Sequence, residues 1–444
     1  MNITYKPSMF NHICKRGDDL VLYNSYLGIK NICVISSGKV NKVSKWLEHS
    51  FKGCIDDSDF RQLVNKGFLV AENVNEKLRR EKIIEEIGSN RILNLVIYPT
   101  NDCNFRCRYC ALDFENKKIA NEVKKGIVGF IQKNISKYEG VTLSWFGGEP
   151  TLEINSIKEI SEKVQKICKT AKKPFMASIT TNGYLLTPQN LNILVECGVL
   201  TYTVTIDGTK ETHDKQRVLA NGMGTYDTII KNLLWLKDNI KSKALNVIIR
   251  TNITKEILAK ADQCYRELDL LFGSDPRFSL FLRPASDWGG ERVKDMYNSL
   301  IVGTSLKDMY TAFFSQRGRL IYSRNMDDLD IAMSTCSATF KNKFTIGING
   351  SICKCDDSDD DLAIGHLTPA GEMIIDEDKR LMWERGYRKG QEQCNDCFFS
   401  CACFLGVCPK AIILGKQGHC IINNIEIDNS IIYASEVLEG VDVI

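Results

Sequence analysis

Residues 98–114 read YPTNDCNFRCRYCALDF, which places Cys103, Cys107 and Cys110 in a C-x3-C-x2-C spacing after the apolar run 93–98. Three thiolates on one short loop can each bind an iron of a cubane cluster, because soft sulfur ligands suit iron–sulfur centres. The fourth iron then keeps an open position, as catalytic metal sites do. A ferredoxin usually supplies a fourth Cys, and a zinc knuckle closes with C-x2-C pairs. The loop therefore predicts a reactive iron–sulfur site.

The bulk composition excludes several classes of protein. Of the 444 residues, 43% are hydrophobic and 25% charged, and the formal net charge is +3, which gives no basis for expecting nucleic acid as a partner. No apolar run approaches the roughly 18 residues of a membrane span. The first residues lack the charged and apolar regions of a secretion signal. We therefore expect a cytoplasmic protein that binds neither membrane nor nucleic acid.

The chain contains eighteen cysteines and five histidines. Disulfides do not account for so many cysteines in a cytoplasmic protein, because the cytosol keeps thiols reduced. Nine of them fall between residues 336 and 420, a part of the chain with few long apolar segments. We expect that region to depend on metal clusters for its stability, with sulfur as the main ligand.

Strands alternate with helices from residue 93 to about residue 290. The expected strands are 93–98, 141–145, 175–181, 202–206, 245–252 and 278–284, and the expected helices lie near 122–134, 155–171, 189–197, 225–240 and 258–270. This alternation predicts an α/β fold, a partial (β/α)6 TIM-like barrel. Active sites of such barrels lie at the carboxyl ends of the strands, and the cysteine loop follows the first strand.

The N-terminal residues predict a separate module. Short strands are expected at 12–15, 20–24, 31–35 and 68–70, with helices at 40–49 and after Asp57. Strands with helices and a Gly-containing hairpin resemble a winged helix. The expected domains are a winged-helix-like module at 1–88, the partial barrel at 89–320 and a Cys-rich iron–sulfur domain at 321–444.

A second motif, Trp-Phe-Gly-Gly-Glu-Pro at residues 145–150, ends the second expected strand. Gly147 and Gly148 allow the backbone to approach a ligand closely. Glu149 adds an acceptor suited to an amino group, and Pro150 follows it. Alone, this segment is equally well a tight turn. Its place one β/α unit after the cysteine loop favours a binding function.

Together, the C-x3-C-x2-C loop and the GGEP segment resemble the radical S-adenosylmethionine (radical SAM) superfamily over about residues 91–290. The resemblance implies that Cys103, Cys107 and Cys110 hold a [4Fe–4S] cluster whose open iron binds S-adenosylmethionine (SAM). It also implies that GGEP receives the methionyl amine and that Tyr109 lies near the adenine. The alternative is a zinc knuckle beside an unrelated turn.

Weaker segments resemble the SAM pocket of similar enzymes. They contain Asn182, Thr205, Asp207, Arg217 and Asn252. Arg217 is the candidate partner for the SAM carboxylate, because a guanidinium binds a carboxylate in a bidentate manner. The alternative for each residue is a turn former, a helix cap or a surface ion pair, and His213 is expected to be structural.

The C-terminal cysteines resemble a SPASM domain, which binds two auxiliary [4Fe–4S] clusters. With the cluster of the C-x3-C-x2-C loop, the resemblance implies three clusters in the chain. The resemblance assigns one auxiliary cluster to Cys336, Cys355 and Cys408, with Cys353 or an open iron, and the other to Cys394, Cys397, Cys403 and Cys420. Four residues separate Cys403 from Cys408 where the family has three, so Cys401 and Cys408 compete for one role. The alternative is a zinc ribbon on Cys394, Cys397, Cys403 and Cys408.

Asp356 directly follows Cys355 and resembles the base position of formylglycine-forming relatives. It also opens the acidic run 356–361. A solvated acidic loop is therefore the alternative reading.

These resemblances together imply a function. A winged helix ahead of a radical SAM–SPASM enzyme resembles peptide maturases, in which the precursor's leader adds a strand to the small sheet. The implied reaction uses a 5′-deoxyadenosyl radical to abstract hydrogen and joins a Cys sulfur to a carbon of the peptide, as in sactipeptide and ranthipeptide synthases. An external reductant of the flavodoxin or ferredoxin type is implied. The alternatives are a C–C crosslink, an anaerobic sulfatase-maturating enzyme, or a non-catalytic metal scaffold.

Overall fold

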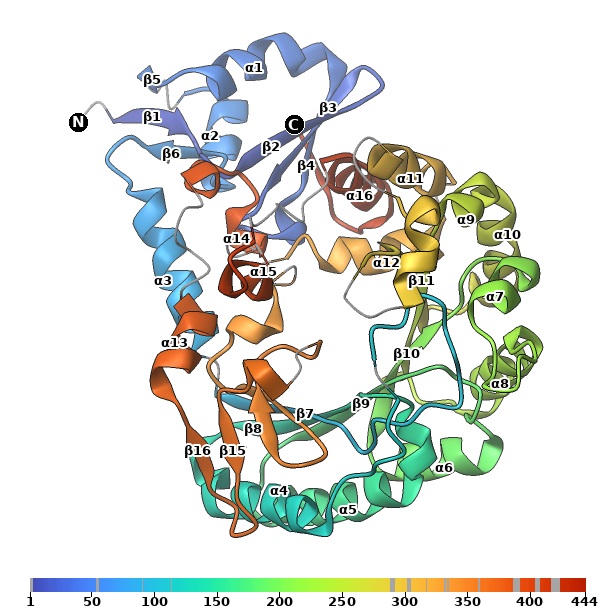
Figure 1. The fold of residues 1–444 in the computed structure, drawn as a ribbon. Helices are drawn as coiled ribbons and strands as arrows, with labels where there is room; N and C mark the ends of the chain where they lie inside the picture. Colours follow the sequence, from blue (N-terminus) through green and yellow to red (C-terminus); the bar gives the residue numbers. More distant parts are fainter. Residues whose placement is uncertain are drawn as a thin grey trace. The chain divides into compact units, whose positions relative to one another are not determined.

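The chain forms two compact units, which are described separately (Figure 1). The structure is a computed structural model that describes residues 3–52, 56–89, 91–112, 114–287, 292–301, 305–316, 318–330, 333, 335–357, 360–385, 392–403, 408–416 and 424–444. The barrel unit consists of Asn90–Ile321 and Lys341–Glu384. The terminal unit consists of Met1–Ser89, Tyr322–Phe340 and Arg385–Ile444.

A ten-stranded sheet forms the centre of the barrel unit, in the order β12-β11-β10-β9-β8-β7-β13-β14-β15-β16. Its strands are β7 (Ile92–Ile97), β8 (Gly140–Trp145), β9 (Phe175–Thr181), β10 (Val199–Thr205), β11 (Asn246–Ile253), β12 (Phe278–Pro284), β13 (Lys343–Ile346), β14 (Ser351–Cys353), β15 (Gly365–Leu367) and β16 (Met373–Ile375). Strands β7 to β12 are parallel neighbours in chain order. The predicted α/β fold with a large parallel sheet is therefore confirmed.

Helices lie along the outer side of this curved sheet (Figure 1). They are α4 (Asn121–Asn134), α5 (Ile154–Thr170), α6 (Pro188–Glu196), α7 (Lys210–Gln216), α8 (Tyr226–Asn239), α9 (Lys255–Ala259) and α10 (Ala261–Phe272), and a further helix, α11 (Ser305–Phe314), packs against α10. Helix α5 buries Ile157, Ile160 and Val164, which recur every three or four residues and form its apolar face. Helix α6 begins where Thr187 caps the Asn190 amide and Pro188 occupies the first helical position.

Strands β13 to β16 extend the sheet beyond what the sequence predicts. Strand β13 pairs in parallel with β7, and β14, β15 and β16 follow as antiparallel neighbours. These strands are three or four residues long, too short for a clear alternation of apolar and polar residues.

The terminal unit contains two small sheets. One has the order β5-β1-β6 and the other β17-β4-β3-β2. The strands are β1 (Thr4–Pro7), β2 (Asn11–Arg16), β3 (Asp19–Asn24), β4 (Cys33–Ile35), β5 (Phe51–Lys52), β6 (Leu69–Ala71) and β17 (Asp442–Val443). The helices are α1 (Val40–Glu48), α2 (Ser58–Asn65), α3 (Glu76–Gly88), α14 (Ser400–Cys403), α15 (Pro409–Ile413) and α16 (Asn424–Val437), and α12 (Arg319–Asp327) and α13 (Glu377–Arg385) span the unit boundaries.

Residues from both ends of the chain share the core of the terminal unit. Tyr23 and Val34 of the N-terminal strands pack in one buried cluster with Leu329 and with Ile431 of α16. Strand β17 adds in parallel to β4, and Ile444 is buried in a second cluster beneath α1 and α2. Among the described residues, no helix is long and apolar enough to cross a membrane.

The pairing of β17 with β4 predicts a specific loss of stability. Ile444 is 3% exposed, and backbone bonds join it to Val34 and Ser36, whereas Val443 is 66% exposed. We expect Ile444→Ala to lower the free energy of unfolding of the terminal unit by about 2–4 kcal/mol, and Val443→Ala to change it by less than about 0.5 kcal/mol. Hydrogen exchange of peptides covering 33–36 measures both changes. Equal protection in the two variants would contradict the packing of Ile444.

Candidate functional site

The cysteine loop follows β7 at the carboxyl end of the parallel strands, as expected. The Arg106 amide donates to the Val218 carbonyl (2.8 Å), which ties the loop to the segment after α7. Cys107 is buried, Cys103 and Cys110 are half-buried, and none of the three forms a disulfide. The loop therefore presents three free thiols at the edge of the sheet where barrel sites form.

The two glycines of the GGEP turn pack directly against this loop. The Gly148 amide donates to the Thr100 carbonyl (3.1 Å) and the Glu149 amide to the Asp102 carbonyl (2.8 Å). A Cβ at Gly148 would lie 2.1 Å from the Asp102 oxygen, and Gly147 has a φ of 114°, which L side chains rarely adopt. The sequence predicts that these glycines allow a ligand to approach; in the structure they allow the cysteine loop to approach.

Glu149 is fully buried and links the turn to β9. Its carboxylate accepts hydrogen bonds from the Thr151 amide (3.0 Å), the Thr181 hydroxyl (2.7 Å) and the Asn182 amide (2.7 Å). These donors are neutral, and no Lys or Arg is among the described groups that shift the pKa of Glu149. Burial raises the pKa of this carboxyl although the hydrogen bonds oppose the rise. A cationic amino group bound nearby would stabilise the charged form. The Asn182 side chain also reaches Cys103 Sγ (3.8 Å).

Four of the predicted residues meet in one buried cluster. The Tyr109 hydroxyl donates to Asp207 Oδ2 and accepts from Arg217 (2.6 Å) and from Asn252 (3.0 Å). The Asn252 amide donates to Asp207 Oδ1 (2.8 Å). Tyr109 lies between the last two cysteines, so the cluster joins the loop to the ends of β10 and β11.

Arg217 has donor capacity left inside this cluster. The residue is 6% exposed, and its Nε–H has no hydrogen-bond partner among the described residues. Burial alone would lower its pKa, but the acidic groups Cys107, Tyr109 and Asp207 beside it raise the pKa above its ordinary value, so the guanidinium stays charged. A buried donor without an acceptor is costly, so a bound carboxylate would satisfy it.

His213 contacts the backbone of this cluster, which is consistent with the structural role expected for it. The Asp207 amide donates to His213 Nδ1 (3.1 Å), so Nε2 carries the hydrogen and faces the Thr225 hydroxyl (3.0 Å). That hydroxyl donates to the Arg217 carbonyl (2.7 Å). Burial lowers the pKa of His213 well below its ordinary value, so the ring is neutral.

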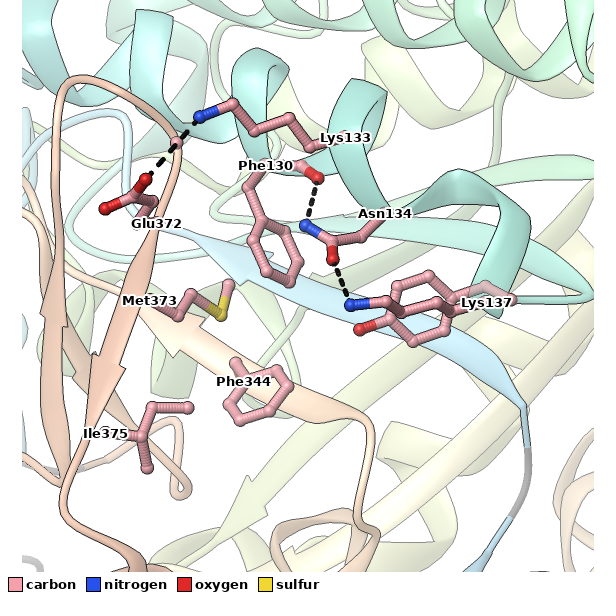
Figure 2. Close-up of a pocket in the computed structure, with 10 residues that line it drawn as sticks. Phe130, Lys133, Asn134, Lys137, Phe344, Glu372, Met373 and Ile375 are labelled. Atoms are coloured by element: carbon pink, nitrogen blue, oxygen red, sulfur yellow. Dashed lines mark hydrogen bonds and ion pairs between the residues drawn. The ribbon is translucent and has the colours of Figure 1, made fainter.

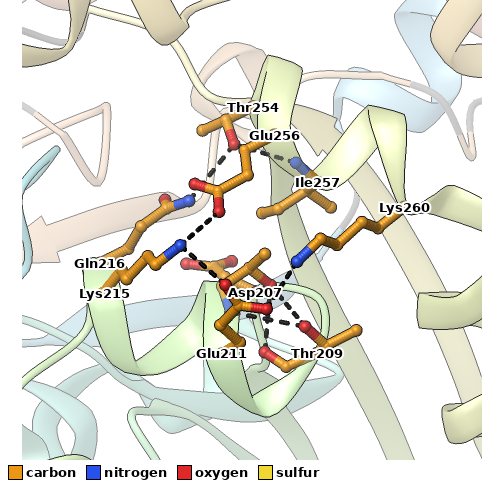
Figure 3. Close-up of polar contacts among 10 residues, drawn as sticks. Asp207, Thr209, Glu211, Lys215, Gln216, Thr254, Glu256, Ile257 and Lys260 are labelled. Carbon is orange, nitrogen blue, oxygen red and sulfur yellow. Dashed lines mark hydrogen bonds and ion pairs between the residues drawn. The ribbon is translucent and has the colours of Figure 1, made fainter.

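Surface ion pairs tie α7 to α9 and α10 on the outer side (Figure 3). Glu211 contacts Lys215 (3.0 Å) and Lys260 (2.7 Å), and Lys215 also contacts Glu256 (2.8 Å). The lysines lower the pKa of Glu211 to about 2. These contacts position α7, at whose end Arg217 lies.

Two predicted residues have mainly backbone roles. Pro150 occupies the first position of the short helix η4 (Pro150–Glu153), where it needs no amide hydrogen. Thr205 is buried and is the last residue of β10.

A groove elsewhere on the barrel unit is separate from this site (Figure 2). It lies beside the amino end of β8, because Tyr138 precedes that strand, whereas the cysteine loop lies at the carboxyl ends. It is lined by Phe130, Lys133, Asn134, Lys137, Tyr138, Phe344, Gly371, Glu372, Met373 and Ile375.

Asp356 forms an ion pair that the sequence does not reveal. Its carboxylate contacts the buried Lys343 ammonium and accepts from the Thr345 hydroxyl (2.9 Å), while its carbonyl accepts from the Tyr98 hydroxyl. The residue thus reaches the end of β7. Its role as a base stays a prediction.

A buried lysine separates two predicted cluster ligands of the barrel unit. Lys354 stands between Cys353, which is buried, and Cys355, which is half-buried. Burial lowers the pKa of Lys354 to about 8 although Glu384, 3.2 Å away, opposes this. Lys354 directly follows β14, and a charged residue at the end of so short a strand carries no sequence signal of burial.

The other predicted auxiliary ligands belong to the terminal unit. Cys394, Cys401 and Cys403 are buried there, and Cys336, Cys397 and Cys408 are half-buried. The buried Arg80 donates to the Cys394 carbonyl (3.3 Å). Cys420 lies outside the described residues. Both auxiliary ligand sets therefore stay predictions.

Comparison with known proteins identifies the barrel. A sequence model of the radical SAM superfamily matches residues 97–262, which contain the cysteine loop, the GGEP turn and the Tyr109 cluster. These residues form a radical SAM superfamily domain. Such a domain implies SAM and a [4Fe–4S] cluster.

Individual relatives resemble larger parts of the chain. It is 28% identical over 283 residues to a cysteine-type anaerobic sulfatase-maturating enzyme of Clostridium novyi (strain NT), covering 60% of this chain and 73% of that one. It is 26% identical over 222 residues to the radical SAM cyclopropyl synthase TigE of Paramaledivibacter caminithermalis, covering 44% of this chain and 45% of TigE. The solved structure "Native anSMEcpe with bound AdoMet and Cp18Cys peptide" has a similar fold (TM-score 0.53, 17% identity, 70% of this chain and 88% of that one).

The residues present fit the implied cofactors. Burial raises the pKa of the Cys103 thiol to about 12 and that of Cys107 to about 11, so a bound cation is needed to hold them as thiolates. In the part of the chain that the structure describes, Glu149 accepts hydrogen bonds from neutral donors, and Arg217 Nε has no acceptor. SAM carries both an amino and a carboxylate group, which complement these two residues.

The close approach at Gly148 predicts how the loop responds to a side chain. We expect Gly148→Ala to displace the Asp102 carbonyl at a cost above about 2 kcal/mol and to reduce cluster assembly on the loop. Gly88→Ala is the control, because its Cβ would meet no atom within 4 Å. Iron and sulfide content after anaerobic reconstitution measures the effect against Cys103→Ala. Full iron content in Gly148→Ala would show that the contact is dispensable.

Proposed function

We propose that this chain is a radical SAM peptide maturase that forms a thioether from a Cys sulfur to a carbon of a ribosomally made precursor peptide. The observation that carries the proposal is the three-cysteine loop beside a buried carboxylate and a buried guanidinium, in a chain that has nine further cysteines between residues 336 and 420. The proposed division is peptide recognition by 1–88, radical chemistry in 89–320 and a SPASM domain in 321–444.

The residues of the barrel unit have separate proposed roles. Cys103, Cys107 and Cys110 bind three irons, Glu149 favours the amino group of SAM, and Arg217 binds its carboxylate. When bound, the cluster and SAM supply a carbon radical that removes a hydrogen atom from the substrate. Glu149 and Arg217 are buried, and their burial limits the access of water to that site.

Peptide recognition is proposed for the sheets of the terminal unit. Among the described strands, β2, β5 and β6 are sheet edges, and such edges accept an added peptide strand. The outer edge of β4 is taken by β17. The peptide named in the anSMEcpe structure supports a peptide as the substrate class.

Formylglycine formation is the second candidate. It is favoured by the likeness to the sulfatase-maturating enzyme and by Asp356, whose carboxylate is held by Lys343 next to Cys355. The products differ, because formylglycine formation from Cys removes the sulfur from the substrate, whereas a thioether retains it and loses two hydrogen atoms.

Substitution of single cysteines tests whether the clusters have different tasks. We expect Cys103→Ala to abolish both deoxyadenosine formation and crosslinking, and Cys394→Ala to abolish crosslinking while SAM cleavage stays within about tenfold, or 1.4 kcal/mol, of the parent. Cys168→Ser, a buried thiol of α5, is the control. Chromatography of deoxyadenosine and mass spectrometry of the co-expressed peptide are the measurements. Normal crosslinking by Cys394→Ala would refute a role of Cys394 in an auxiliary cluster. Loss of sulfur from the peptide substrate of the parent enzyme would favour formylglycine formation.

Leader dependence needs the intact chain. Deleting 1–88 would expose the core that Tyr23 and Val34 share with Ile431, so it would test stability instead of recognition. We expect a core peptide without its leader to be modified at least about tenfold more slowly, and the leader added in trans to restore the rate. An unchanged rate for the leaderless peptide would contradict the proposed recognition of the leader.

A further inference from the structure

A group of metal-ligating atoms in the terminal unit includes none of the cysteines assigned to the predicted clusters. His12 Nε2, Cys14 Sγ and Asp428 Oδ1 all lie within 4.8 Å of one another. His12 Nε2 is 2.5 Å from Asp428 Oδ1, and Cys14 Sγ is 3.6 Å from the same oxygen. Three ligand atoms of different chemistry thus converge on one point.

The fold explains why these atoms converge. His12 and Cys14 are two residues apart on β2, so their side chains point to the same face of the strand. Asp428 belongs to the first turns of α16, which packs on β2 and β3. The convergence therefore depends on the docking of α16, because His12 and Asp428 are 416 positions apart in the sequence.

Burial across the group is graded in a way that suits a metal ion. Cys14 is 3% exposed, His12 is half-buried, and the Asp428 side chain is 43% exposed. The His12 ring stacks on Phe398 with ring centroids 4.0 Å apart, which restricts its orientation. The exposed side at Asp428 provides an entry path and room for water as a fourth ligand.

We propose that His12, Cys14 and Asp428 bind one Zn²⁺ ion that joins β2 to α16. An imidazole nitrogen, a thiolate and a carboxylate are the three ligand types that zinc uses in proteins. A thiolate and a carboxylate together balance the charge of the ion, whereas calcium and magnesium prefer oxygen ligands throughout. The site is independent of the proposed function.

Metal analysis of the holoenzyme tests this site. After anaerobic reconstitution fills the iron–sulfur sites, the protein is equilibrated with ZnCl2 and passed over a desalting column. We expect about one zinc per chain in the parent and loss of that zinc in His12→Ala, Cys14→Ser and Asp428→Asn. Cys33→Ser is the matched control, because Cys33 is a buried thiol of the same sheet that is absent from the group.

Cobalt provides a second readout, and its first arm uses the parent protein alone, as the difference spectrum on adding Co²⁺ to the reconstituted enzyme. Co²⁺ bound to the parent should show thiolate-to-metal absorption in the near ultraviolet, and Cys14→Ser should lose it while Cys33→Ser retains it. Zinc should also raise the Tm of the parent but not of Cys14→Ser. Zinc content equal in all variants, or a parent without the cobalt–thiolate band, would overturn the proposal. Loss of iron instead of zinc from Cys14→Ser would also overturn it, since Cys14 shares a core with Cys403.

Discussion

The contact between the GGEP turn and the cysteine loop is the constraint on which the candidate site depends. Gly148 lies so close to the Asp102 carbonyl that no side chain fits between them, and the Glu149 amide donates to that same oxygen. The Glu149 side chain then reaches Asn182 at the end of β9. Three successive strands thereby hold one loop, so the positions of its thiols are set before any metal binds.

Buried charge in this site is arranged for a ligand with two different charged groups. Among the described residues, the Glu149 carboxylate receives only neutral donors, and the Arg217 Nε–H has no acceptor although Asp207 and Tyr109 lie beside it. Burying such groups is unfavourable unless they are paired. A zwitterionic amino acid moiety offers an amine and a carboxylate, so the unsatisfied groups favour binding of SAM.

The terminal unit depends on contacts between the two ends of the chain. Strand β17 completes one sheet, α16 covers its face, and Ile444 and Ile431 contribute to the two cores. The proposed zinc site adds a bond between the same elements.

Local patterns in the sequence were sufficient for the barrel and for the loop at its centre. Strands β9 and β12 have the bounds that the sequence predicts. The C-x3-C-x2-C spacing identifies the thiols because neighbouring residues on one loop must lie close together. Contacts between residues far apart in the sequence could be identified only from the tertiary structure. Three contacts leave no periodic signal in the sequence, since each depends on how separate elements pack. They are the Lys343–Asp356 ion pair, the approach of Gly148 to Asp102 and the contact of His12 with Asp428.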